Sequence, residues 1–321
     1  MRPQRMLRAL GPAAGCALLT GSTTAAAQAP APAATTAPAP SIAISVADRE
    51  LAFGQPLLIR GRATSPAADT VELQFRPRGA GAWSAVGRAT PAVDGRFRVR
   101  ASLKRSGAVR VVTPTTAAPR STDATGFAAA SRERRIVVAA RVSASSARLD
   151  VLRGAKASVK GAVRPGLAGR RVRLERLEGK RWTGLTTGKT DGAGRYALTV
   201  RAGTTGSAPV RVRFTGDDAN GSAQRTVGRL NVYRGALASR YDDYGGPLAC
   251  GGRLGYRAMV VAHKGLPCGT TLAIRYRGRT VQATVRDRGP YVGGREFDLA
   301  GAVARKLGFD GVGTVWVAVQ R

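Results

Sequence analysis

Short runs in which apolar and polar residues alternate dominate residues 41–233. Residues 71–75 and 172–176 are two examples, and Gly, Pro and Asp-Gly turns separate such runs. A period of two is typical of strands that bury one face, whereas a helical stripe longer than a turn or two is missing from this part of the sequence. The pattern predicts antiparallel β structure.

The two halves of this segment follow the same pattern, which indicates an internal repeat. A pair of glycines seven residues apart opens each half, and Trp83 and Trp182 each lie fourteen residues before another aromatic residue. The repeat predicts two immunoglobulin-like β-sandwiches, residues 41–138 and 139–233. One tryptophan at a matching position in each copy is expected in the sandwich core, and the alternative is a surface on which sugars stack.

The pattern changes after residue 233. Strands are expected at residues 271–276, 280–285 and 314–319, and residues 299–307 have helical spacing, with apolar residues alternating with basic ones. Residues 234–321 are therefore predicted to form a small β domain with one short helix.

The beginning of the chain predicts export. Three arginines precede a short apolar stretch and a run of alanines, which is the pattern of a secretory signal peptide over residues 1–27; a first core helix is the alternative. Cys16 leaves lipid attachment as a second alternative. Residues 28–40 are rich in Pro and Ala and predict an extended linker. No later stretch of the sequence has the roughly 20 apolar residues of a transmembrane segment.

The formal net charge of +33 indicates a polyanionic partner, and only seven of the 52 basic residues are lysines. Composition alone does not separate nucleic acid from an anionic wall or membrane. An exported protein does not meet nucleic acid in its normal compartment. Anionic wall polymers are therefore the expected partner, and nucleic acid is not.

Removal of residues 1–27 would leave two cysteines, Cys250 and Cys268. An even pair in an oxidising compartment predicts a disulfide, and two free thiols or half a metal site are the alternatives. With one histidine in the whole chain, no metal site and no cofactor are expected. The acidic run at residues 217–220 is expected to be a polar turn, with calcium binding as the alternative.

Residues 285–299 are the candidate for chemistry. Asp287 stands between Arg286 and Arg288 and precedes a Gly-Pro turn, and a second carboxylate, Asp298, follows eleven residues later. Acids, bases and turn residues do not concentrate in this way elsewhere in the sequence, so any active site is expected here.

Five motifs in this part of the chain resemble a known family. They are Ala-Ser-Arg-Tyr at 238–241, Leu-Ala-Cys-Gly-Gly at 248–252, Val-Ala-His-Lys-Gly-Leu-Pro-Cys-Gly-Thr at 261–270, Val-Arg-Asp-Arg-Gly-Pro-Tyr-Val-Gly-Gly-Arg at 285–295 and Phe-Asp-Leu at 297–299. Together they resemble the rare lipoprotein A (RlpA) family, which is related to expansins. The resemblance implies a six-stranded double-psi β-barrel with a short helix, and a lytic transglycosylase that cleaves peptidoglycan glycan strands.

The resemblance also implies roles for individual residues. Asp287 matches the catalytic aspartate, which would protonate the leaving oxygen and then accept the proton of the sugar's 6-hydroxyl. His263 would support Asp287 or bind the sugar, or is simply structural. Asp298 is the second candidate for the proton, or else a cap for the helix. Glu296 is expected to be solvated. The residues implied in substrate binding are Tyr241, Arg286, Arg288, Tyr291 and Arg295.

Two positions depart from the family pattern. Gly252 stands where a glutamate is common, and Arg240 stands where a tryptophan is usual. These departures leave two other functions open. One is an expansin-like protein that binds and loosens the wall without cleaving it, and the other is a cationic adhesin in which the sandwiches bind wall polymers.

Overall fold

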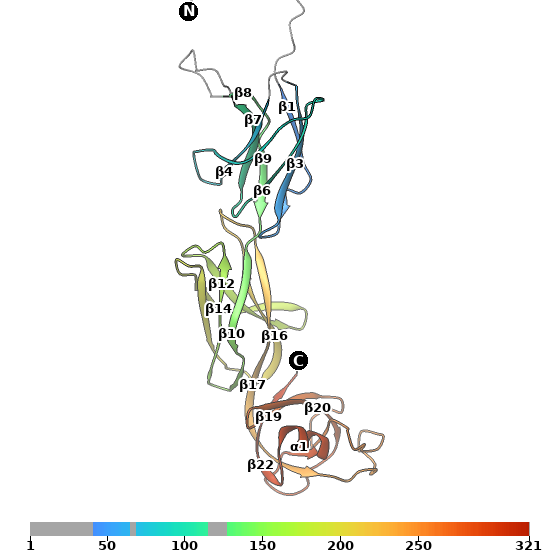
Figure 1. Cartoon of the computed structure of the whole chain (residues 1–321). Coiled ribbons are helices and arrows are strands. Elements are labelled where there is room, and N and C mark those ends of the chain that lie inside the picture. Colours follow the sequence, from blue (N-terminus) through green and yellow to red (C-terminus); the bar gives the residue numbers. More distant parts are fainter. Residues whose placement is uncertain (1–40, 65–68, 115–126, 321) are drawn as a thin grey trace, which may run out of the picture. The chain divides into compact units, whose positions relative to one another are not determined.

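The computed structural model describes residues 41–64, 69–114 and 127–320. Strands make up most of these residues, and one short helix lies near the C-terminus (Figure 1). The predicted all-β fold is confirmed. The expected signal peptide, Cys16 and the linker lie outside the described residues. Within the described part of the chain, no helix combines the length and apolar character needed to cross a membrane.

Two sheets form the first β unit. One sheet has the order β1 (Ile42–Val46), β3 (Pro56–Ala63), β6 (Arg96–Ser102). The other has the order β2 (Glu50–Leu51), β9 (Arg134–Val138), β7 (Gly107–Pro114), β4 (Val71–Pro77), β5 (Ser84–Ala89), with β8 (Phe127–Ala130) also paired to β7. Alternate residues of both sheets are buried in one apolar core, as the period of two requires.

The second β unit repeats this order. β10 (Arg141–Arg148), β12 (Lys156–Arg164) and β15 (Arg195–Arg201) form one sheet. The other contains β14 (Arg181–Lys189), β13 (Arg171–Glu178), β16 (Gly206–Phe214) and β17 (Ala223–Tyr241), with β11 (Asp150–Leu152) beside β17. These strands enclose a second core. The matching strand orders agree with the internal repeat, while the immunoglobulin-like assignment and the domain boundaries stay predictions.

The tryptophans are not core residues, so that expectation is wrong. Trp83 and Trp182 are half-buried and belong to neither core cluster. The guanidinium of Arg110 lies 4.4 Å from the ring centroid of Trp83, and that of Arg211 lies 4.1 Å from Trp182. Stacking under an arginine covers the ring at the sheet surface, which removes the need for burial in the core.

Residues 217–220 form the expected polar turn. The Asp217 carboxylate accepts hydrogen bonds from the backbone N–H groups of Ala219 and Asn220. It also forms an ion pair of 2.9 Å with the buried guanidinium of Arg170. Both oxygens of the carboxylate are therefore used within the fold.

Six strands close into a barrel at the C-terminal end. Their order is β17, β21 (Phe297–Ala300), β18 (Val260–His263), β20 (Arg279–Asp287), β19 (Thr271–Tyr276) and β22 (Val312–Val319), and β22 pairs with β17 to complete the ring. Helix α1 (Gly301–Leu307) follows β21 and packs on the same apolar core. The expected six-stranded barrel with a short helix is confirmed, and three strands and the helix lie where the sequence pattern predicts them.

Candidate functional site

The two candidate acids lie on one row across the barrel sheet. Ala262 on β18 is the register partner of Asp287 on one side and of Asp298 on the other, and Asp298 is in turn opposite Ser239 on β17. Laterally paired residues project to the same face. Two strand spacings separate the acids, which places their backbones about 10 Å apart. Ala262, which lies between them on the row, carries only a methyl group and is buried.

A bulge places Asp287 on this row. The register of β18 against β20 runs from Val261–Val285 directly to Ala262–Asp287, so Arg286 is the extra residue. Without the bulge, Arg286 would be opposite Ala262. A bulge re-aims the side chains next to it, and here it places a carboxylate instead of a cation opposite Ala262.

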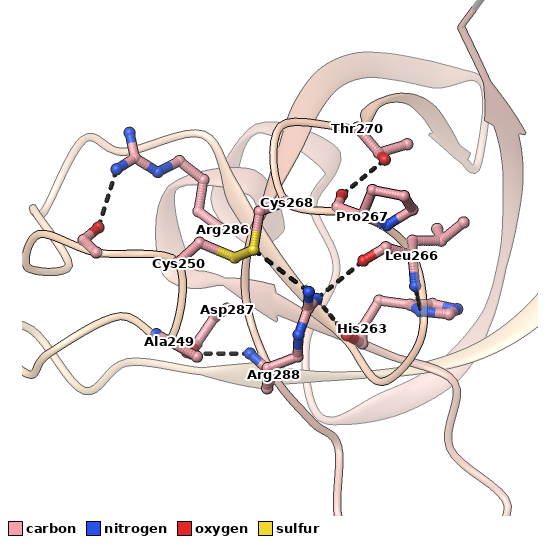
Figure 2. Close-up of a disulfide and its surroundings, with 11 residues drawn as sticks. Ala249, Cys250, His263, Leu266, Pro267, Cys268, Thr270, Arg286, Asp287 and Arg288 are labelled. Carbon is pink, nitrogen blue, oxygen red and sulfur yellow. Dashed lines mark hydrogen bonds between the residues drawn. A yellow bond between two sulfur atoms is a disulfide. The ribbon is translucent and has the colours of Figure 1, made fainter.

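Backbone N–H groups hold one oxygen of Asp287. Oδ1 accepts hydrogen bonds from Ala249 (3.0 Å) and from Arg288 (2.9 Å). Figure 2 shows Ala249 approaching Asp287 from the loop that carries Cys250. Among the described residues, Oδ2 accepts no hydrogen bond of standard geometry, and the Tyr241 hydroxyl is close enough to interact with this carboxylate. Oδ2 is therefore the oxygen available to exchange a proton with a ligand.

The hydroxyl of Tyr241 lies near both acids. It is buried and has no hydrogen-bond partner in the described part of the chain. Burial raises the pKa of Tyr241, the charge of Asp287 and a side-chain interaction with its carboxylate raise it further, and Asp298 adds to the shift. The hydroxyl therefore stays protonated and is close enough to both acids for their negative charges to raise its pKa.

Asp298 does not cap helix α1, so that alternative is wrong. The N-cap residue is Ala300, which makes no side-chain capping bond, and Asp298 lies two residues earlier inside β21. Its Oδ1 accepts a hydrogen bond from the Ser239 hydroxyl. A Cβ on Gly289 would lie 3.6 Å from Oδ2 of Asp298, so the turn after Asp287 passes close to the second acid.

His263 pairs with Glu296 in this structure. Its Nε2 lies 3.5 Å from Oε1 of Glu296, and its Nδ1 accepts hydrogen bonds from the N–H groups of Gly265 and Leu266. The proton of the neutral ring is therefore on Nε2. Glu296 also makes a two-pronged ion pair with Arg234, so the expectation that it is solvated is wrong. Support of Asp287 by His263 remains a prediction.

The pair of His263 and Glu296 makes the stability of the fold depend on pH, in a direction that their pKa shifts define. Burial lowers the pKa of His263, and Glu296 offsets this only in part; the hydrogen bond from Arg234 lowers the pKa of Glu296. For both groups the unfolded chain binds protons more tightly, so stability is lost as pH falls. We expect the melting temperature to fall by a few degrees from about pH 7 to pH 5.5, the range in which an unfolded histidine titrates near 6.5.

His263 is the single histidine of the chain, so one variant isolates its part. In His263→Asn the decline between pH 7 and 5.5 should flatten, because no imidazole is left to titrate. Calorimetry of both proteins across this range is the measurement. An unchanged slope in His263→Asn would assign the decline to carboxylates.

The two arginines beside Asp287 make contacts within the protein. Arg288 donates to the carbonyl oxygens of His263 (3.1 Å) and Leu266 (2.9 Å) and lies 3.3 Å from the sulfur of Cys268 (Figure 2). Arg286 donates to the carbonyl of Gly251. Substrate binding by these two arginines stays a prediction, and in the structure Arg288 ties the loop after β18 to the end of β20.

The expected disulfide is present. Cys250 and Cys268 are bonded, with their Cα atoms 5.8 Å apart. The backbone N–H of Cys250 also donates to the carbonyl of Arg286. The bond therefore joins two loops that both contact the strand end at Asp287.

Gly252 has a backbone that suits glycine. Its φ is +84°, a conformation that strains residues with a Cβ, and a Cβ there would lie 3.6 Å from Nη2 of Arg286. Where the resemblance leads one to expect a glutamate, the side chain of Arg286 is the nearest group. The second carboxylate on the row that holds Asp287 is Asp298.

The remaining predicted residues lie at the edge of the site. Tyr291 is 83% exposed, and its ring is 3.8 Å from where a Cβ of Gly289 would be. Arg295 is half-buried and makes no ion pair with the residues that the structure describes. The sequence interpretation assigned no role to Ser239 or Arg234. Ser239 lies within the motif at 238–241, but its position opposite Asp298 depends on strand register. Arg234 reaches Glu296 from 62 positions away and had no local signal.

Comparisons with known proteins concern the residues that form the barrel. Residues 234–319 match the family described as lytic transglycolase. A segment of 103 residues is 36% identical to "Probable endolytic peptidoglycan transglycosylase RlpA" of Nostoc sp., covering 30% of this chain and 28% of that protein. A segment of 92 residues is 45% identical to the protein of the same name from Aquifex aeolicus, covering 27% and 41%. The chain thus spans less than half the length of these relatives.

Among solved structures, the Streptomyces papain inhibitor (SPI) matches 28% of this chain and 94% of its own, with 26% identity and a TM-score of 0.25. The family match, the RlpA relatives and the closed six-stranded barrel all concern the same residues. The C-terminal part of this chain, residues 234–319, is therefore an RlpA-like double-psi β-barrel domain of the lytic transglycolase family.

Proposed function

We propose that the protein is an exported lytic transglycosylase that cleaves the glycan strands of peptidoglycan, with Asp287 as the acid and base. The observation that carries the proposal is the environment of Asp287. Oδ1 is held by two backbone N–H groups, whereas Oδ2 accepts no hydrogen bond of standard geometry from the described residues. A fixed carboxyl with one free oxygen is suited to deliver a proton to a glycosidic oxygen and to take one back.

The reaction needs one carboxyl group in two successive roles. Protonated Asp287 gives its proton to the oxygen that leaves, and the glycosidic C–O bond breaks. The resulting carboxylate then accepts the proton of the 6-hydroxyl as that oxygen bonds to the anomeric carbon, which forms the 1,6-anhydro ring without water. The protonated hydroxyl of Tyr241 would stabilise the intermediate carboxylate, and Asp298 would stabilise positive charge on the sugar.

The relatives and the sequence support the class of reaction and the export of the protein, but not the roles of individual residues. The names of the matched proteins specify a peptidoglycan transglycosylase. Peptidoglycan lies outside the cytoplasmic membrane, which agrees with the signal-peptide pattern of residues 1–27. The test is product analysis: the purified protein, incubated with peptide-free glycan strands, should release fragments with 1,6-anhydro ends. A folded protein that releases none would leave wall binding or loosening through the same site as the remaining functions.

A specific surface favours wall adhesion as a second function. Five arginines project from the outer face of the β1-β3-β6 sheet: Arg60, Arg62, Arg96, Arg98 and Arg100, which we call the arginine ladder. Register places Arg60 opposite Arg98 and Arg62 opposite Arg96. Like charges directly opposite each other destabilise a sheet. On this face the Asp94 carboxylate contacts only Arg96.

The ladder also borders a hollow of about 770 Å³. Of the five arginines, Arg96 alone has an acidic partner among the described residues. Closely spaced guanidinium groups with so few acidic partners favour a polymer that carries repeated phosphate or carboxylate groups, because Arg binds both in a forked geometry. We therefore propose that this face binds anionic wall polymers while the barrel acts on the glycan.

The double variant Arg60→Gln/Arg98→Gln should weaken binding to isolated walls several-fold, and the remaining binding should depend less steeply on salt. Arg49→Gln/Arg132→Gln is the matched control, since it removes the same charge from exposed turn and loop positions. Co-sedimentation with walls at several salt concentrations measures both. Equal losses in the two variants would mean that net charge alone, and not the ladder, determines binding.

A further inference from the structure

Exposed aromatic side chains are confined to the barrel. Among the described residues they are three tyrosines, Tyr244, Tyr256 and Tyr291, which are 37%, 61% and 83% exposed. The tryptophans of the two sandwich units are half-buried beneath arginines. Leaving an aromatic face in water has an unfavourable free energy, so their concentration in the domain that holds the acids points to a ligand.

Two of these tyrosines are in ring contact with each other, and an arginine holds both. The ring centroids of Tyr244 and Tyr256 are 5.1 Å apart, with an angle of 49° between the ring planes. The guanidinium of Arg305 lies 4.0 Å from the Tyr256 centroid. It also donates to the Tyr244 hydroxyl (2.6 Å) and to the Tyr256 carbonyl (2.7 Å). We call these three residues the tyrosine platform.

The backbone is adapted to hold the platform in place. The Tyr244 hydroxyl donates to Oδ1 of Asp242, and Arg240 donates to the other oxygen of that carboxylate. A Cβ on Gly301 would lie 1.9 Å from Asp242 and 2.0 Å from the Tyr244 hydroxyl. Only glycine lets the start of helix α1 approach this closely. Tyr244 is therefore fixed by its polar end, and its ring cannot turn away to bury itself.

The platform is joined to the row of acids by short stretches of chain. Gly301 follows Asp298 by three residues of extended chain, a distance of about 10 Å. Tyr244 follows Tyr241, whose hydroxyl is near both acids, by the same number of residues. The loop that carries both platform tyrosines also carries Ala249, which donates to Asp287. A polymer that places one bond at Asp287 can therefore extend over the platform.

The chemistry of the platform fits a saccharide. The C–H groups on one face of a pyranose ring carry partial positive charge and pack against the negative face of an aromatic ring. The Tyr256 hydroxyl, which has no partner among the described residues, is available to a sugar hydroxyl. The neighbours Asp243, Gly255 and Arg257 are exposed and include no large apolar side chain, whereas a protein interface would need a wider apolar core.

We propose that the tyrosine platform is a sugar-binding subsite, which stacks a pyranose unit of the glycan strand away from the bond at Asp287. This inference rests on the proposed function for the identity of the ligand. It is independent of turnover, because a subsite contributes affinity whether or not the bond is broken.

Binding without turnover tests the subsite. The full chain carrying Asp287→Asn is titrated with peptide-free glycan fragments of defined length by calorimetry. Adding Tyr256→Ala should weaken the affinity for long fragments about tenfold, which corresponds to about 1.4 kcal/mol. The shortest fragments that still bind should lose less, because they do not reach the platform. Tyr256→Phe keeps the ring and should retain most of the affinity.

Val312→Ala is the matched control, since Val312 is another exposed apolar side chain of the barrel, and it should bind like the parent. An unchanged affinity in Tyr256→Ala with an unchanged melting temperature would overturn the subsite, as would undetectable binding by the parent. Loss of affinity in Tyr256→Ala, together with no anhydro product from the unmodified protein, would support the subsite and contradict the transglycosylase.

Discussion

Replacing Asp287 with asparagine should reduce the release of 1,6-anhydro fragments by about a hundredfold to ten-thousandfold, the range that general acid–base groups contribute. Asparagine keeps a carbonyl oxygen for the N–H groups of Ala249 and Arg288, so the loop contacts at this strand end can persist. What it lacks is a proton that it can give and take back. Quantifying anhydro ends after incubation with peptide-free strands measures the loss.

Two further variants make this result specific. Asp310→Asn removes a carboxylate of the barrel that is 88% exposed, and its activity should be unchanged. Asp298→Asn tests the second acid of the row and should reduce turnover less than Asp287→Asn does. If Asp298→Asn abolishes the product and Asp287→Asn does not, the proton donor is Asp298. All variants should retain the melting temperature of the parent within a few degrees.

The sequence predicted the strands of the barrel well because their pattern is local. Residues 271–276 alternate in a way that only a strand explains, and β19 has these same bounds. The acid row could not be predicted in this way. It depends on which strands become neighbours and on a bulge at Arg286 that shifts Asp287 by one position. Neither feature can be recognised from the residues around Asp287 in the sequence.

The same limit explains the expectations that were wrong. A carboxylate two residues before a helix cap is a reasonable capping candidate, yet β21 continues through Asp298 and turns its side chain toward Ser239. Glu296 looked solvated because its partner Arg234 lies far away in the sequence. In both cases the decisive contact joins residues that are far apart in the sequence and that the barrel sheet brings together. A prediction from neighbouring residues alone does not detect such a contact.

The structure also changes the meaning of the resemblance at Gly252. Judged from the sequence, a missing glutamate weakens the case for turnover. In the fold, this position has a positive φ and faces Arg286, while Asp298 lies on the same row as Asp287. The chain therefore has a second carboxylate, supplied by a different strand, and its contribution is what the Asp298 variant measures.

Removing the disulfide should have the largest effect on stability. Cys250 and Cys268 are separated by 18 positions, and a crosslink that closes a loop of this size contributes on the order of 3 kcal/mol, mainly by restricting the unfolded chain. In Cys250→Ser/Cys268→Ser the urea midpoint of the barrel transition should fall accordingly. Reductant should lower the midpoint of the unmodified protein in the same way and leave the variant unaffected.

The same variant should lose activity before it unfolds. Ala249, which donates to Asp287, is next to Cys250, and Arg288 contacts the sulfur of Cys268. Freed from the bond, these loops would hold Oδ1 of Asp287 less firmly, so anhydro product should fall under conditions where the barrel remains folded by circular dichroism. Full activity in the folded variant would show that backbone hydrogen bonds alone position the acid and that the disulfide serves only stability.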